Sequence, residues 1–211
     1  MLTSGRGDVV DGPVWTRLIG GTNLQDLDIV DVTDPELVEA VVPDLNLFTV
    51  PILIGAMSNG VNQAITEIRA RASGSGSLLL TRFHGHGAPG LAAISHGTSR
   101  LNPGINPVLA QSVFTTEVVK MLRPLLQGVA PLMHNMGFVE FHSCRTAQGP
   151  NGTAMISDLS AIWKAPVTAG LSRQKGGGNL NFVLQQPSFT SFPEKATLKT
   201  WASGRQAMPS V

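Results

Sequence analysis

The stretches 77-SLLLTRFHGHG-87 and 138-FVEFHSC-144 decide the fold of this chain. Each begins as a short apolar run of the kind that forms a buried strand, and each ends in reactive side chains. A helical pattern over 115–127 separates them, so they are expected to be neighbouring strands of a parallel sheet. Ligands bind beyond the carboxyl ends of such strands. The ends at His84–Gly87 and His142–Cys144 are therefore the first place to expect a functional site.

Alternating strand and helix patterns extend on both sides of these two stretches. Strands buried on both faces are predicted at 48–56 and 165–170, and a short return strand at 91–97. Helices are predicted over 61–72, over 115–127 with a kink at Pro124, and over 152–164. Repeated βαβ units indicate an α/β fold, with a mostly parallel sheet covered by helices.

Charge divides the chain unevenly. Residues 1–46 carry nine acids and two bases, whereas residues 47–211 carry five acids and thirteen bases. Within the acidic part, 27-LDIVDV-32 is a candidate short strand. The pattern Thr33-x-x-Glu36 predicts a helix over 34–42 that stops before Pro43. We interpret 1–46 as an acidic N-terminal segment, either a pro-segment or an extension over the sheet edge, and 47–211 as the main domain.

Two further segments carry loop signals. The run Ser73–Ser77 reads as a flexible connector that a protease could cut. Residues 171–211 are rich in Gly, Ser and Pro, with strand-like pieces at 181–186 and 196–201. This tail is expected to wrap the sheet edge or to carry substrate-binding loops.

Composition excludes several function classes. The chain has 211 residues, 42% of them hydrophobic, which suits one folded domain. No run of Lys and Arg interleaved with aromatics supports nucleic-acid binding. No apolar stretch reaches the roughly 18–20 residues of a membrane span. The N-terminus lacks the pattern of a signal peptide, so we expect a cytoplasmic protein or one exported without a cleaved signal. The sequence does not set the oligomeric state.

Only one cysteine is present, which excludes an intrachain disulfide and leaves any thiol chemistry to Cys144. A thiol is a good nucleophile as the thiolate, and a nearby imidazole can sustain that form. His84 and His86 are the candidates for this imidazole. The backbone N–H groups of Gly87 and Cys144 are candidate oxyanion donors.

The segments RFHGHGAPGLAAI and FVEFHSCRTA, in this order on a βαβ pattern, resemble the two signatures of caspases, legumains, gingipains and clostripain. The resemblance covers about residues 48–170 and implies a caspase-like three-layer sandwich. It also implies a cysteine endopeptidase that cleaves a protein or peptide substrate through an acyl-enzyme, without cofactor or metal. His86 would be the catalytic histidine, because its His-Gly directly precedes the hairpin, and Cys144 would be the nucleophile.

The specificity pocket follows from the same resemblance. The residue two before the cysteine lines this pocket in several relatives, which makes His142 a pocket residue, with His84 and Ser172 as its companions. Relatives often carry a basic residue after the first strand, where this chain has Met57–Gly60. Caspase-type specificity for Asp is therefore not expected. The histidines instead suggest a polar or acidic side chain before the cleaved bond.

Several alternatives compete with this reading. Cys144 could be a buried, inert residue. His84, His86, His142 and Cys144 are a plausible zinc set by residue type. Gly85-x-Gly87-x-x-Gly90 fits a dinucleotide fingerprint, although neither the helix nor the acid that this motif requires follows. A caspase-like interaction module without activity is the remaining alternative.

Overall fold

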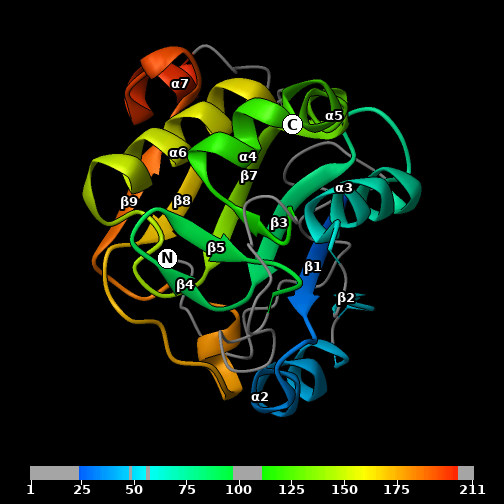
Figure 1. Cartoon of the computed structure of the whole chain (residues 1–211). Helices are drawn as coiled ribbons and strands as arrows, with labels where there is room; N and C mark the ends of the chain where they lie inside the picture. Colours follow the sequence, from blue (N-terminus) through cyan, green and yellow to red (C-terminus); the bar gives the residue numbers. More distant parts are fainter. Residues whose placement is uncertain (1–23, 48, 56–57, 97–110, 204–211) are drawn as a thin grey trace.

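The computed structural model describes residues 24–47, 49–55, 58–96 and 111–203. Its main feature is a six-stranded sheet in the order β2-β1-β3-β7-β8-β9 (Figure 1). The first five strands are parallel, and β9 runs antiparallel to β8. The prediction of an α/β fold with a mostly parallel sheet is confirmed. In sheet order the strands are β2 Ile52–Ile54, β1 Gln25–Asp31, β3 Leu78–His84, β7 Met133–His142, β8 Val167–Gly170 and β9 Ser188–Ser191.

The two stretches that suggested the fold are adjacent strands, β3 and β7. Their register pairs Phe83 with Phe141 and His84 with His142. Because side chains alternate between the faces of a sheet, the two phenylalanines lie on one face and the two histidines on the other. The sequence therefore places an apolar and a polar set of side chains back to back across the same two strands.

Four helices cover the apolar face and bury the main core. They are α3 Gly60–Arg71, α4 Thr116–Met121, α5 Arg123–Gln127 and α6 Gly149–Trp163. Phe83 and Phe141 stack with ring centroids 4.9 Å apart, and Phe114 and Trp163 pack around them. Each of these four rings is at most 2% exposed. Burial of such rings contributes several kcal/mol each and fixes the helices on this face.

The opposite face carries α2 (Pro35–Leu45) and the short helix η3 (Gly178–Asn181). Val41 and Leu45 of α2 are buried against Val30 of β1, with Phe182 packed nearby. In Figure 1, α2 lies at the bottom of the view, away from α4, α5 and α6 at the top. Helices on both faces of the sheet are compatible with a three-layer arrangement.

A second, small sheet follows β3 directly. It consists of β4 (Gly87–Ala88), β5 (Leu91–Ala93) and β6 (Val113–Phe114), paired antiparallel. The glycines of the GxGxxG pattern thus lead from a strand into a hairpin. A dinucleotide fingerprint needs a helix there, whose N-terminus holds the pyrophosphate. The nucleotide alternative is therefore wrong.

The acidic N-terminal segment differs most from its sequence prediction. β1 lies between β2 and β3, inside the sheet, and α2 packs upon it. Leu27 and Ile29 of β1 lie in the main core, and α2 packs on the other face of the same strand, so residues 25–45 are part of the sheet domain and are not an extension appended to it. The predicted strand at 48–56 shrinks to β2 at the edge of the sheet, where Leu53 is 52% exposed. Residues 1–23 lie outside the described part of the chain.

Helix ends differ in detail from the sequence predictions. α2 continues through Pro43 to Leu45, because Val41 and Leu45 are buried in its last turns. The helix expected over 115–127 is two helices, which divide at Leu122, just before Pro124. The helices predicted over 61–72 and 152–164 correspond to α3 and α6, with α6 beginning three residues earlier.

The C-terminal tail was predicted less well. The piece 181–186 is not a strand, and 196–201 lies largely in helix α7 (Leu198–Ser203). Two short 3-10 turns, η2 (Ala130–Leu132) and η4 (Pro193–Lys195), complete the described elements. The connector at 73–77 is held in place, since Ser75 Oγ and Gly76 N–H both donate to the carbonyl of Pro131.

Candidate functional site

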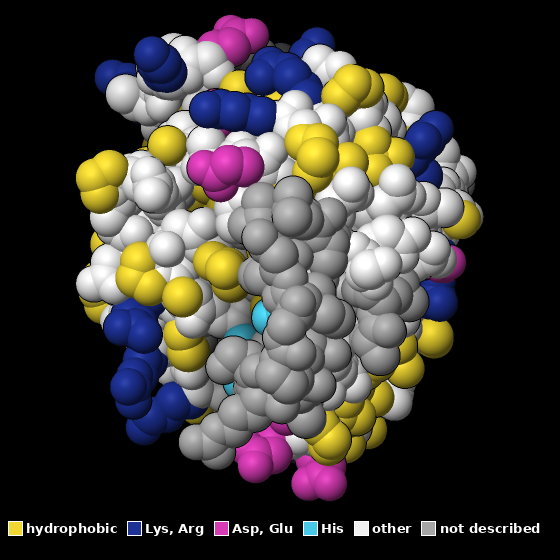
Figure 2. Space-filling model, viewed as in Figure 1, with side chains coloured by type: hydrophobic (Ala, Val, Ile, Leu, Met, Phe, Trp, Pro, Cys, Tyr) yellow, Lys and Arg dark blue, Asp and Glu magenta, His cyan; other side chains and the backbone are white. Residues whose placement is uncertain are grey.

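A cavity of about 250 Å3 opens at the carboxyl ends of β3 and β7. The β-strand ends form its floor, α2 forms one wall, and the loop between β8 and β9 forms the other. The residues that line it are Glu36, Leu37, Ala40, Val41, His84, Gly85, His86, His142, Cys144, Gln174, Lys175, Gly176, Leu180, Asn181 and Gln185. Histidine side chains reach the surface on this side of the molecule (Figure 2). The site thus lies where ligands bind in open parallel sheets.

Cys144 lies two residues beyond the end of β7. Its Sγ accepts a hydrogen bond from the backbone N–H of Gln174 at 3.3 Å and lies 3.5 Å from the carbonyl oxygen of Gln174. The next residue, Arg145, has a positive φ of 55° and donates its N–H to Ser172 at 2.8 Å. A non-glycine residue in this conformation costs about 1 kcal/mol or more and persists only where contacts impose it. The tight turn directs the backbone away immediately after the thiol.

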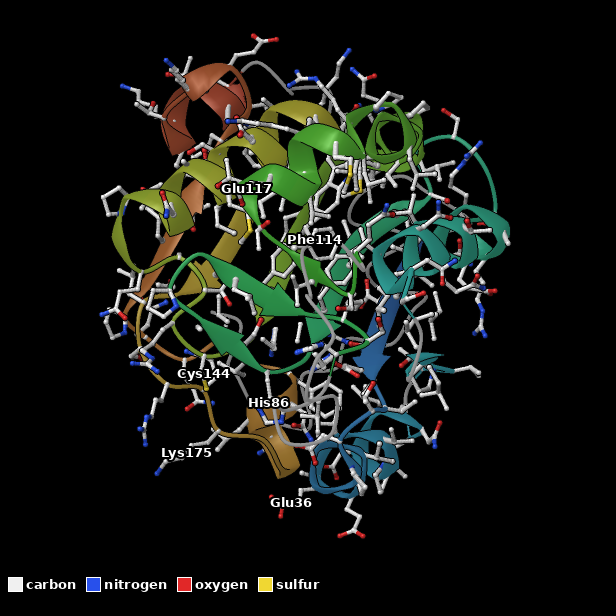
Figure 3. The ribbon with its side chains drawn as sticks, viewed as in Figure 1. Glu36, His86, Phe114, Glu117, Cys144 and Lys175 are labelled. Carbon is white, nitrogen blue, oxygen red and sulfur yellow. The ribbon has the colours of Figure 1, made fainter. Side chains whose placement is uncertain are left out.

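His86 lies two residues beyond the end of β3 and lines the same cavity as Cys144. Figure 3 shows both residues at the same end of the sheet. The Nε2 atom of His86 is 2.6 Å from Oδ2 of Asp34, and 45% of the His86 side chain is exposed. Burial favours a higher pKa for Asp34, but hydrogen bonds from His86 and from the Glu36 N–H outweigh it and lower that pKa. Asp34 is therefore a carboxylate that orients the exposed imidazole.

Asp34 is also the N-cap of α2. Its Oδ1 accepts the N–H of Glu36 at 2.9 Å, while Oδ2 binds His86. One carboxylate thus starts the helix and fixes the imidazole. The helix-capping pattern was visible in the sequence, although it placed the cap one residue earlier, at Thr33.

Gly87 lies directly against the backbone of Cys144. A Cβ atom at position 87 would be 2.5 Å from the carbonyl oxygen of Cys144 and 2.9 Å from its nitrogen. The N–H of Ala93 donates to His86 O at 2.8 Å. In an antiparallel ladder the next pair, Gly87 and Ala92, is then a non-hydrogen-bonded pair. The N–H of Gly87 therefore points away from β5 and makes no ladder bond to it.

His84 is buried behind His86 and belongs to an ionic cluster. Its Nε2 lies 2.9 Å from Oδ1 of Asp28. Arg82 donates hydrogen bonds to both carboxylate oxygens of Asp28, at 2.6 and 2.8 Å. Burial lowers the pKa of His84 to about 4, although the bond to Asp28 opposes that change. Burial would raise the pKa of Asp28, but the hydrogen bonds from Arg82 and His84 hold it well below its ordinary value. Near neutral pH, His84 is therefore uncharged beside an ion pair.

His142 occupies the equivalent place on β7. Its Nε2 is 2.8 Å from Oε2 of Glu140, and its ring centroid is 4.9 Å from that of His84. Each of the two floor histidines therefore has a carboxylate behind it, from β1 for His84 and from its own strand for His142. Such carboxylates select the tautomer that carries the proton on Nε2.

The loop after β8 completes the site and is fastened to α2. Asn181 donates to the carbonyl of Ala40 at 2.8 Å and to Asp44 at 2.9 Å, and Gly178 N–H donates to Asp44 at 2.7 Å. Gln174 is held within the loop, since its Oε1 accepts the Gln185 N–H at 2.9 Å. Both walls of the cavity are thus one connected unit.

The predicted site residues come together with one difference. His84, His86, His142 and Cys144 all line the cavity, and Gly87 packs on Cys144. Ser172 is not among the lining residues. Its carbonyl accepts N–H groups from Arg145 and from the Gln174 side chain, so it supports the loop from behind.

Sequence reasoning missed the carboxylates and the arginine of this site. Asp28, Asp34 and Glu140 each bind one histidine, and Arg82 neutralises Asp28. A signal was present, because charged residues alternate with apolar ones in 27-LDIVD-31 and 81-TRF-83. Charges within buried strands are rare unless they are paired.

The zinc alternative required His84, His86, His142 and Cys144 to converge on one point. Instead the three Nε2 atoms face three different carboxylates. Within the described ranges, no group of three or more His, Cys, Asp or Glu side chains is arranged to hold a metal ion. The geometry therefore does not favour a zinc centre.

Comparison with protein-family models, with curated proteins and with solved structures finds no match to this chain. Among the described residues, no helix is both long and apolar enough to cross a membrane. The case for a function therefore rests on the cavity and its side chains.

Proposed function

We propose that this chain is a cysteine endopeptidase with a caspase-like fold, in which Cys144 is the nucleophile and His86 the general acid and base. One observation carries the proposal. The only thiol of the chain and an oriented, solvent-accessible histidine line the same cavity, each two residues beyond the end of adjacent parallel strands. Catalytic pairs of this kind need a nucleophile and a base that reach the same substrate atom.

The surroundings of Cys144 suit a nucleophile. The backbone N–H of Gln174 donates a hydrogen bond to the sulfur at 3.3 Å and so holds the side chain in one position at the cavity. Cys144 is partly exposed and lines an open cavity, so a substrate carbonyl can approach. A buried structural cysteine would pack among apolar side chains instead.

The surroundings of His86 suit proton transfer. Asp34 binds Nε2 at 2.6 Å, and the second ring nitrogen, Nδ1, has no hydrogen bond within the described part of the chain, so it can exchange a proton with thiol or leaving group. Together Cys144, His86 and Asp34 have the roles of nucleophile, base and orienting acid, which recur in unrelated hydrolases.

The reaction follows from these positions. The thiolate of Cys144 attacks the scissile carbonyl carbon, and the N–H groups of Gly87 and Cys144 hold the oxyanion. His86 gives a proton to the leaving amine, which departs and leaves a thioester on Cys144. His86 then takes a proton from water, the hydroxide attacks the thioester, and the acid product leaves as the Cys144 thiolate and the protonated His86 of the starting state are restored.

The test compares Cys144→Ala and His86→Ala with the unaltered chain on a diverse peptide library. Both substitutions are expected to reduce cleavage at least 10³-fold. His134→Ala is the matched control, since His134 lies at the opposite end of β7 and is expected to keep full activity. Cleavage that survives Cys144→Ala would overturn the proposal.

A second measurement does not depend on finding a substrate. The rate at which iodoacetamide alkylates Cys144 is compared in the unaltered chain and in His86→Ala. An activated thiol reacts faster than free cysteine at pH 7, and the His86 substitution is expected to slow it about tenfold. If Cys144 reacts no faster than free cysteine and no peptide is cleaved, the cavity belongs to an inactive interaction module.

A further inference from the structure

The cavity also indicates which substrates the proposed peptidase prefers. We propose that it is the primary specificity pocket and that it takes a cationic side chain, lysine or arginine, at the residue before the scissile bond. This inference rests on the proposed function for its place in a peptide, although the preference of the cavity for a cation can be tested without any catalysis.

Two histidines on the floor of the cavity each have one ring nitrogen beside a carboxylate. His84 and His142 both line it, and each uses its Nε2 proton on a carboxylate, Asp28 or Glu140. In a neutral imidazole with the proton on Nε2, the other ring nitrogen, Nδ1, is an acceptor. His84 stays neutral near pH 7, since burial lowers its pKa to about 4. A neutral His84 whose Nε2 proton goes to Asp28 leaves an acceptor nitrogen and not a cation at this position, which suits a side chain that donates, such as a guanidinium, an ammonium or an amide.

Charge favours the cation over the amide. The groups that line or directly support the cavity include four carboxylates, on Asp28, Asp34, Glu36 and Glu140. Two permanently cationic side chains oppose them, Arg82 and Lys175, so the excess is two negative charges. A protonated His86 would offset one of the two. The buried members of this set are screened little by salt.

Glu36 and Lys175 are the two charged side chains that line the cavity itself, besides the histidines. Both are exposed, and they come from opposite walls, α2 and the loop after β8. In Figure 3, Lys175 lies below Cys144, and Glu36 lies below His86. Their substitution should therefore move the preference in opposite directions, with little effect on folding.

An acidic side chain is a poor fit for the same reasons. The sequence suggested one, because histidines commonly bind carboxylates when they are protonated. His84 cannot take this role near neutral pH, since it is uncharged and its Nε2 proton goes to Asp28. Size adds a limit. A volume of about 250 Å3 is below the roughly 300 Å3 at which pockets for drug-sized ligands begin, which suits one amino-acid side chain.

The first test uses binding alone. Cys144→Ser, which cannot form a thioester, is titrated with three probes: agmatine, which carries a guanidinium at one end and an ammonium at the other, butyramide, which carries an amide, and butyrate, which carries a carboxylate. Agmatine is expected to bind at least tenfold more tightly than the other two. Equal affinity for all three, or tightest binding of butyrate, overturns the inference, and so does tightest binding of butyramide.

Three variants at the rim sharpen the test. In the Cys144→Ser background, Glu36→Gln is expected to weaken agmatine binding about three- to tenfold, and Lys175→Gln to strengthen it two- to fivefold. Glu39→Gln is the matched control, because Glu39 is an exposed acid of the same helix that does not line the cavity. It is expected to change affinity less than twofold. An equal loss in Glu36→Gln and Glu39→Gln means that general charge, and not this cavity, attracts the cation.

The second test uses catalysis and keeps the two proposals apart. Peptides that differ only in the residue before the scissile bond are offered with Arg, Lys, Asn and Asp there, and kcat/KM is measured. Arg or Lys is expected to exceed Asn and Asp at least tenfold. If Asn or Asp peptides are cleaved with the higher kcat/KM, the preference for a cation is wrong and the proposed peptidase activity is retained. If agmatine binds selectively but no peptide is cleaved, the proposed peptidase activity is wrong and the cavity is a binding site for cations.

Discussion

The two faces of the sheet differ in what they do. On one face, Phe83 and Phe141 pack with Phe114 and Trp163 under four helices. On the other, Arg82 and His84 join an ionic cluster under α2 and the loop after β8. The same strands supply both sets, because neighbouring residues point to opposite faces. Burial of the apolar face stabilises the fold. Burial of charged groups on the polar face costs free energy, which the stabilisation from the apolar face offsets.

The difference between the faces shows that the site forms only together with the sheet, because its residues come from several strands. Asp28 comes from β1, Arg82 from β3 and Glu140 from β7, so the cluster exists only when three strands pair in one register. Deleting residues 1–46 would remove β1 from the interior of the sheet. Loss of activity in that deletion would report loss of the fold, not the removal of a pro-segment.

The largest effect is expected on the apolar face. Phe141→Ala deletes a fully buried ring that contacts three other aromatic rings and should lower the free energy of unfolding by about 3–5 kcal/mol. Denaturant unfolding followed by tryptophan fluorescence measures this change. Cys144→Ala is the comparison from the site, and it should change stability by less than about 1 kcal/mol. Equal losses in both variants would remove the distinction between the faces.

A similar but chemically different effect is expected in the ionic cluster. Arg82→Met leaves the carboxylate of Asp28 buried without its cation, which costs about 3 kcal/mol or more. Adding Asp28→Asn removes the unpaired charge, so the double variant should recover part of the loss. Urea unfolding of the single and double variants measures the two free energies of unfolding and so tests this expectation. If Arg82→Met alone is as stable as the unaltered chain, the cluster is not held as described.

Acid should weaken the polar face through His84. Its native pKa of about 4 lies below the ordinary value of about 6.5. As the pH falls below 6.5 the unfolded state takes up a proton first, so this contribution to stability falls and is fully lost once the pH passes below about 4. Between pH 7.5 and 4.5 the expected loss is about 2–3 kcal/mol.

Urea unfolding at a series of pH values measures this loss, with His84→Gln as the comparison. The variant lacks the titrating ring and should show a flatter profile between pH 7.5 and 4.5. Asp28 does not contribute in this window, because its depressed pKa matters only below the ordinary carboxyl value. Parallel profiles for both proteins would show that His84 is not held neutral.

The smallest expected effect separates the two roles of Asp34. Asparagine is as good an N-cap as aspartate, so Asp34→Asn should keep α2 and stability while removing the charge beside His86. It should lower kcat of the proposed peptidase about 10–100-fold and leave KM nearly unchanged. Asp34→Ala should lose the same activity and about 1 kcal/mol of stability as well. A kcat that Asp34→Asn leaves intact would reduce Asp34 to a helix cap.

Much of the fold was predictable, and most errors have one cause. Local pattern identified β3, β7, α3 and α6, because each is a long periodic segment. It undervalued β1, since acids in 25–31 made that strand look like a solvated lead-in. A strand with charges inside is stable only if a partner such as Arg82 neutralises them. That partner lies more than 50 residues away, beyond the reach of local pattern.

The sequence by itself determined the reactive groups. It supplied one thiol, a His-Gly before a hairpin, and two strands whose ends had to meet. Only the tertiary structure decided their chemistry. It paired His86 with Asp34, kept His84 neutral on the floor of the cavity, and completed the walls of the site with α2 and a loop some 140 residues away. The reason is physical, because the pattern of side chains is local whereas burial and charge pairing depend on residues brought together by the fold.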